Sequence, residues 1–424
     1  MATQEVTIKS QLEGLYKEVY GEKVENLIPE NAKLVKLIPF RDAEKLGEVF
    51  HMPVILTDEQ GVTYAGSDED AFTLEKPEAM TTKPARLKGS QLLIRSAIGY
   101  KAAAAAVKGG PKAFLNATEL VIKRMMASLT KRLEIALLYG GSGLGRIDGF
   151  TNVSATETTV DFPAGQFAPG IWVGSQCARI DVYDSAGVLV VADLQVGRVN
   201  IKDKKINITG AGADITTLEA ALGALVGSDY LDIFFKGAKD KEMLGLDKII
   251  TTNGSLFGID NSIYDLHKGQ EFDVQNGQLT FDKLTDALVC AINYGLQDDV
   301  SVFVSPETWQ DLNNDEAALR EYDASYSSSK AEKGVNAIVY NHAGIKMEVM
   351  HHPMVKEGDA FMFAKKKLRR VGAWPESMRT PGYGGEIFRQ LDDQAAFELR
   401  AYTDQALFVD HVSHCVKLFN IVNS

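Results

Sequence analysis

The chain has 424 residues, of which 45% are hydrophobic and 24% are charged, which argues against a wholly disordered protein and suggests two to four structural units. No apolar run approaches the roughly 18 residues that a membrane-spanning helix requires, so no membrane partner is predicted. The net charge of −12 argues against a dedicated nucleic-acid binder, whose affinity would come from clustered lysines and arginines. This negative charge does not exclude a protein that forms a wall around nucleic acid.

The N-terminus and the cysteines both indicate a reducing compartment. Residues 1–5 have neither the basic start nor the apolar stretch of a secretory signal. Cys177, Cys290 and Cys415 are widely spaced and odd in number. We therefore expect reduced, buried side chains rather than a disulfide frame.

The first predicted unit is an N-terminal arm, residues 1–47. Apolar residues at positions 12, 15, 16 and 19 fall on one face of a short helix. The segment 34–40 is expected to be extended.

Residues 48–100 predict a long two-stranded ribbon. Strand-like runs at 49–64 and 86–94 flank roughly 20 residues that contain no tight turn. A two-stranded ribbon alone is marginal in water, so this one should rest on something else. A neighbouring copy of the same chain would supply that surface. The candidate intersubunit contacts are charged residues of the ribbon: Asp68, Glu69, Asp70, Lys76, Lys83 and Arg86.

The strongest helix signal is the segment 115–139, within a unit spanning residues 101–159. Apolar residues repeat there every three or four positions, Asn116 and Thr118 are candidate N-caps, and the glycines of 140–143 end the helix. About 24 residues at 1.5 Å each predict a rod of roughly 36 Å.

Residues 160–235 predict an inserted β-rich unit of its own. Short strand-like runs, the first at 172–173 and later ones at 188–191 and 198–201, are separated by turn residues. One helix is expected at 218–226.

The remaining units, 236–345 and 346–424, alternate helix and strand. Thr280 is a candidate cap for a helix over 280–296, and a buried strand at 300–304 leads into a helix that opens with Pro306. Further strands are expected at 346–350, 360–364, 368–371, 395–402 and 406–421.

This order of parts resembles the major capsid proteins of tailed bacteriophages, which have the Hong Kong 97-type shell fold. The resemblance is carried by the stretches 245–250, 254–260, 302–309, 344–350 and 368–372. It implies an α+β capsid fold with an N-terminal arm, an extended β-hairpin loop, a long spine helix, a peripheral domain and an axial domain. The parts correspond to 1–47 (arm), 48–100 (loop), 101–159 with 346–424 (spine helix and peripheral domain), 236–345 (axial domain) and an additional inserted domain, 160–235.

The resemblance also implies a function. Many copies would assemble as pentamers and hexamers into an icosahedral shell around double-stranded DNA, forming part of a virion assembled in the host cytoplasm. The implied partners are the chain itself, portal and scaffolding proteins, a decoration protein and packaged DNA bound without sequence preference. The arm is short for a built-in scaffold, so we expect a separate scaffolding protein or early proteolysis. No enzyme activity and no cofactor is predicted.

The densest basic run consists of Lys365, Lys366, Lys367, Arg369 and Arg370. A solvated strand or turn is the simplest interpretation. The functional interpretations are an inner surface that faces packaged DNA, or a contact with an acidic patch of a neighbour such as 67–70.

Three other motifs could carry chemistry. The glycines of 141–145 follow a helix, whereas a dinucleotide-binding loop follows a strand, so a simple turn is favoured. His411, His414 and Cys415 could suggest a metal site, but in an extended strand the second histidine would face away from the other two residues. Some members of the resembled family form an isopeptide cross-link from a loop lysine. The candidates here are Lys76, Lys83 and Lys88, without a matching asparagine.

Two rival functions stay open. A nanocompartment shell of the same fold would contain protein rather than DNA. A soluble α/β enzyme with a β accessory domain would form a small oligomer with a ligand pocket.

Overall fold

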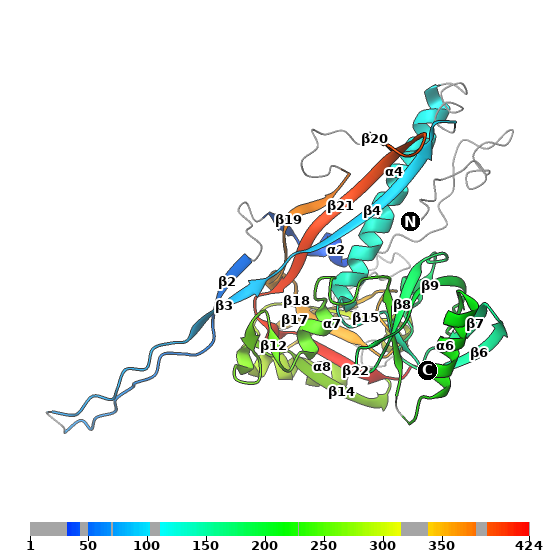
Figure 1. The fold of residues 1–424 in the computed structure, drawn as a ribbon. Coiled ribbons are helices and arrows are strands. Elements are labelled where there is room, and N and C mark those ends of the chain that lie inside the picture. The colour runs from blue at the N-terminus through cyan, green and yellow to red at the C-terminus, as the bar shows by residue number, and fades with distance from the viewer. Residues whose placement is uncertain are drawn as a thin grey trace, which may run out of the picture.

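The computed structural model describes residues 32–42, 50–68, 71–101, 111–227, 229–314, 338–378 and 388–423. It shows an α+β protein, as predicted, with one long helix and two long strands lying side by side, a globular body at one end and a thin ribbon that projects from the body (Figure 1). The helix expected at 12–19, and the side chains of Glu69 and Asp70, lie outside the described residues.

The long helix is α4, Pro111–Tyr139. It begins four residues before the predicted start, so Asn116 and Thr118 are interior positions and not caps. Met125 and Leu129 are buried against Leu399 and Ala401 of a sheet that runs beside the helix. The helix ends at Tyr139, as predicted. The next residue is Gly140, and a Cβ at this position would clash with the carbonyl oxygen of Met243.

That sheet has five strands in the described chain, centred on the 14-residue strand β21. β4 pairs with β21 over its whole length, from Gly99 opposite Ala396 to Ser90 opposite Gln405. The run 86–94, expected to be one strand of the ribbon, is therefore divided, and its second half belongs to the body. The strands are β1 (Phe40–Asp42), β4 (Ser90–Gly99), β19 (Leu368–Ser377), β20 (Phe388–Gln390) and β21 (Ala396–Val409).

The segment 34–40 is not extended throughout. Leu34–Leu37 form the short helix α2, and the chain becomes a strand only at Phe40, which pairs in parallel with Arg370 of β19. Leu34 and Ile38 are buried, so packing overrides the extended pattern.

A seven-stranded sheet makes up the β-rich part of the body. It starts at Gly145, so three of its strands begin before residue 160. The runs expected at 188–191 and 198–201 are one strand, and the residues around Trp172 form the short helix α5 (Pro169–Trp172). The strands in spatial order are β5 (Gly145–Ile147), β11 (Leu231–Phe235), β8 (Arg179–Asp184), β9 (Leu189–Asn200), β10 (Lys205–Thr209), β7 (Glu157–Asp161) and β6 (Gly149–Ser154).

This sheet does not have a core of its own. Ile180 and Val182 of β8 share one hydrophobic cluster with Leu133 and Leu137 of α4 and with Phe361. The helix predicted at 218–226 is present as α6 (Gly212–Gly223), which starts six residues before the predicted position. The β-rich part and the long helix therefore fold as one packed unit.

A six-stranded sheet with α8 and α9 completes the body. The side chain of Thr280 accepts a hydrogen bond from the backbone N–H of Lys283, which confirms the predicted cap. All five residues of β15 are buried. The elements are α7 (Leu246–Thr251), α8 (Phe281–Asn293), α9 (Pro306–Asn314), β14 (Gln270–Gly277), β15 (Val300–Val304), β16 (Ile338–His342), β17 (Ile345–His351), β18 (Ala360–Ala364) and β22 (Val416–Ile421).

Candidate intersubunit surfaces

The base of the ribbon packs on its own chain. β2 (Phe50–Ile55) pairs with β3 (Thr82–Leu87), and Ala85 and Leu87 are buried in a cluster with Ile259 and Phe408. The expectation that the whole ribbon lacks internal support is therefore wrong for its base. The cause is the small β-hairpin β12 (Ser255–Leu256) and β13 (Ile259–Asp260), which lies beneath β3.

Two predicted contact residues belong to this base. The backbone N–H of Arg86 donates to the carbonyl of Phe257 at 2.7 Å. The Lys83 ammonium lies 4.8 Å from the centre of the Tyr264 ring. Both residues therefore anchor the ribbon to its own body.

The ribbon tip, residues 57–80, is different. In its described part, the two sides are joined by an isolated bridge between Gln60 and Glu78 and by a hydrogen bond from the Glu75 N–H to the Thr63 hydroxyl at 2.9 Å. The tip projects away from the body (Figure 1). Tyr64 is 90% exposed and Leu74 is 74% exposed, and Val62, Phe72 and Met80 are exposed as well. Such an apolar surface in water is unfavourable by about 25 cal/mol per Å², which favours a covering partner.

The basic run is mostly neutralised within the chain. Lys365, in the 3₁₀ turn η3 (Lys365–Lys367), pairs with Glu348 at 2.5 Å. Lys366 and Lys367 lie 3.6 and 3.5 Å from the two carboxylate oxygens of Asp298. Lys366 remains 78% exposed, so among these three residues the predicted contact with packaged DNA or with a neighbouring subunit applies best to Lys366.

The two arginines of the run are structural. Arg369 pairs with Asp410. Arg370 is buried, which contradicts the solvated interpretation, and it donates at 3.0 Å to the carbonyls of Ile38 and Val35 and also pairs with Glu376. It therefore joins the N-terminal segment to β19.

The histidine cluster also differs from the prediction. The 3₁₀ turn η4 (Val412–His414) interrupts the expected strand, so the rings of His411 and His414 stack with centroids 4.9 Å apart while Cys415 is buried. In the described part of the chain no three His, Cys, Asp or Glu side chains converge as metal ligands. The glycine turn likewise engages its own chain, because the Gly141 N–H donates to Glu242 at 2.9 Å.

His267 lies beside the ribbon base, with its Nδ1 2.7 Å from the Asn261 side-chain oxygen. Burial lowers its pKa to about 4, whereas the unfolded chain keeps a value near 6.5. Between these values the unfolded state binds the proton and the folded state does not, so stability falls as the pH falls from about 6.5 to 4. We expect the free energy of unfolding of His267→Gln to fall by roughly 1–2 kcal/mol less than that of the wild type over this pH range, a figure that is reduced for solvent screening. Urea unfolding across the range measures this difference. An unchanged slope would contradict this assignment.

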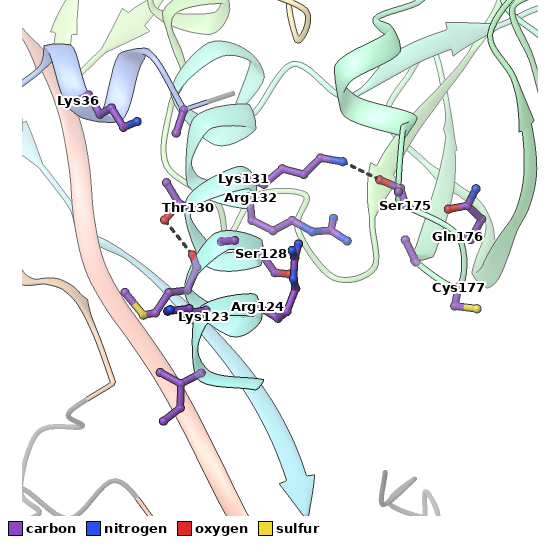
Figure 2. A pocket seen from close by; sticks show the side chains of 16 residues that line it. Lys36, Lys123, Arg124, Ser128, Thr130, Lys131, Arg132, Ser175, Gln176 and Cys177 are labelled. Carbon is purple, nitrogen blue, oxygen red and sulfur yellow. Dashed lines mark hydrogen bonds between the residues drawn. The ribbon is translucent and has the colours of Figure 1, made fainter. Parts of the chain in front are cut away.

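A basic pocket lies between α4 and the turn Gly174–Ala178, which sequence analysis missed (Figure 2). The cavity measures about 710 Å³. Its cations are Lys36, Lys123, Arg124, Lys131 and Arg132. A signal was present in the sequence: residues 120–133 contain four cations and no carboxylate.

Two of these cations are held at the back of the pocket. Lys131 donates to the Val173 carbonyl at 2.6 Å and to the Ser175 hydroxyl at 3.2 Å, and burial, with the nearby Arg132, lowers its pKa to about 8. The Arg132 guanidinium lies 3.2 Å from the centre of the Phe235 ring, and burial lowers its pKa to about 10, against the attraction of Glu242. Cys177 is exposed at the rim, contrary to the expectation that all three cysteines are buried.

Comparisons with known proteins give a fold but no sequence relative. No protein-family model and no curated protein matches the chain. The structure aligns with the Cyanophage A-1(L) capsid asymmetric unit at a TM-score of 0.56 and 12% identity, over 96% of this chain and 98% of that one. The chain has the fold of a phage capsid protein.

Two further structures align with this capsid-fold chain at lower TM-scores. The capsid of a native GTA particle aligns at a TM-score of 0.49 and 9% identity, over 99% of both chains. The holo-SrpI encapsulin complex of Synechococcus elongatus PCC 7942 aligns at 0.41 and 10% identity, over 99% of this chain and 96% of that one. Both are too distant to refine the assignment. None of the described helices combines the length and apolar character needed to cross a bilayer.

Proposed function

We propose that this chain is a major capsid protein, whose copies assemble as pentamers and hexamers into an icosahedral shell that encloses double-stranded DNA. The observation that carries the proposal is the ribbon tip, an exposed apolar segment on a capsid-type fold. Its apolar side chains gain a covered environment only when another molecule lies against them. Because each subunit both gives and receives such contacts, many modest interfaces add up in a closed shell.

The domain assignment is part of this proposal. The ribbon would be the extended loop and α4 the spine helix of a Hong Kong 97-type fold. The five-stranded sheet would belong to the peripheral domain, the six-stranded sheet to the axial domain and the seven-stranded sheet to the inserted domain, which would start at Gly145, where the first strand of that sheet begins, rather than at residue 160. A virion location, assembly in the host cytoplasm, and portal, scaffolding and decoration partners belong to the same proposal.

The test is particle formation by the purified chain, followed by light scattering and negative-stain microscopy. We expect closed particles of megadalton mass. Nuclease-protected DNA in particles from infected cells would support the virion role, whereas protein cargo would indicate a nanocompartment. A chain that stays a small oligomer at all concentrations and binds a small ligand would favour the soluble-enzyme alternative and contradict the proposal.

A further inference from the structure

Two crossovers between the five-stranded and six-stranded sheets lie side by side. The chain passes from β18 to β19 through η3, and from β21 to β22 through η4. β18 pairs with β22 in one sheet, and β19 pairs with β21 in the other. The Asp410 N–H donates to the Lys367 carbonyl at 2.9 Å, which joins the two turns. Two adjacent short turns between two sheets have the geometry of a hinge.

A stacked pair of histidines lies in this hinge. The ring centroids of His411 and His414 are 4.9 Å apart, and the ring planes are inclined by 18°. His414 is buried, and its Nε2 lies 3.1 Å from the carbonyl oxygen of Tyr294, so the neutral ring donates from Nε2. Its Nδ1 is buried and has no hydrogen-bond partner in the described chain. A proton on Nδ1 would therefore add a buried donor without an acceptor.

The carboxylates beside the histidine pair are already engaged. Asp298 lies within 3.6 Å of both Lys366 and Lys367. Asp410 pairs with Arg369. A protonated ring would have to compete with these cations for the same carboxylates.

Three other elements, η2, α7 and α8, also pack on η4. Their buried ionisable side chains are His267 and Asp247. His267 is bonded to Asn261, and Asp247 pairs with Lys417 at 2.5 Å, so both already have partners of their own. The other ionisable side chains of these elements are exposed or half-buried: Asp265, Lys248, Asp282, Lys283, Asp286 and Cys290.

The surroundings disfavour protonation of the stacked rings. Burial is the main cause that lowers the pKa of both imidazoles. The His414 ring and Lys367 lower the pKa of His411 further, against the attraction of Asp410 and Asp298. Rings that separate into water regain an ordinary pKa near 6.5. The separated state therefore binds protons more readily, and a pH below about 6.5 favours it.

We propose that His411 and His414 form an acid-sensitive latch, which holds η3 and η4 together while both rings are neutral and releases them when the rings are protonated. Two positively charged rings in contact repel each other, and separation relieves this repulsion. The latch operates within one subunit. The inference therefore goes beyond the proposed shell function and does not depend on it.

Hydrogen exchange of the full-length chain, followed by mass spectrometry, tests the latch. Rates at about pH 7.5 and about pH 5.0 are normalised to those of unstructured peptides. We expect a peptide over 408–416 to lose about tenfold in protection at the lower pH, because the Asp410 N–H is freed from Lys367. A peptide over β15 should keep its protection at both values.

Two substitutions of the more exposed ring change the response in opposite directions. His411→Gln cannot take up the charge, so the loss of protection should shrink to less than about twofold. His411→Lys carries a permanent charge, so the 408–416 peptide should already exchange rapidly at about pH 7.5. A purely structural role would not give these opposite pH profiles.

Two further histidine variants are the controls. His51→Gln changes an exposed residue of β2, and His267→Gln changes the buried histidine of η2. Both should keep the wild-type response of the 408–416 peptide. Equal protection of the wild type at both pH values, a wild-type response in His411→Gln, full protection of His411→Lys at about pH 7.5, or a response that disappears in either control would overturn the latch.

Discussion

Replacing residues 57–80 by a two-residue Asn-Gly turn is expected to abolish particle assembly and leave the subunit folded. The backbone N–H of Leu56 donates to the carbonyl of Thr81 at 2.9 Å, so the two strands already meet at the spacing of a tight hairpin. The deletion removes the exposed apolar side chains of the tip but leaves Ala85 and Leu87 in their cluster. Light scattering should show subunits or small oligomers in place of megadalton particles.

Thermal unfolding of the same variant provides the control. Because the deleted residues lie outside the ribbon-base cluster, we expect the Tm of the unassembled subunit to change by only a few degrees. Normal particles from the deletion variant would show that the tip has no part in assembly.

Glu134→Ala is expected to lower the free energy of unfolding by about 3–5 kcal/mol. This fully buried carboxylate of α4 accepts from the backbone N–H groups of Leu34 and Val35 at 2.5 and 2.8 Å, and lies 2.8 Å from His352 Nε2. Its removal leaves two buried polar groups and one partly buried group without this partner, and each fully buried group costs about 1–3 kcal/mol. The loss is measured by urea unfolding of the unassembled subunit.

Two variants calibrate that loss. Glu134→Gln retains an acceptor oxygen and should lose less than the alanine variant. Glu271→Ala removes an exposed carboxylate of β14 and should change stability by no more than about 0.5 kcal/mol. Equal effects of Glu134→Ala and Glu271→Ala would show that the buried contact does not stabilise α2.

Local sequence patterns predicted the elements that carry a clear signal of their own, such as a helical repeat, an N-cap residue or an all-apolar run. The helical repeat located most of α4, Thr280 marked the start of α8, and the all-apolar run gave β15. The division of 86–94 between β3 and β4 could not be predicted, because it depends on pairing with β21, roughly 300 residues away.

The site residues show the same limit. Lys367 and Arg369 looked like free cations because their partners, Asp298 and Asp410, are distant in sequence. The basic pocket is likewise assembled from α2, α4 and the turn 174–178, and a sequence pattern could identify only the cations of α4. The ribbon was predicted in outline, because its strand-like runs and the long stretch between them are visible in the sequence itself. Its base could not be predicted, because Ile259 and Phe408, which pack on it, are distant in the sequence.

Cryo-electron microscopy of assembled particles tests the central claim most directly, since it shows what covers Tyr64 and Leu74. We expect a closed shell in which both side chains are buried against another copy of the chain. Shells whose ribbon tips extend freely into solvent, or a preparation that contains no shells, would contradict the account.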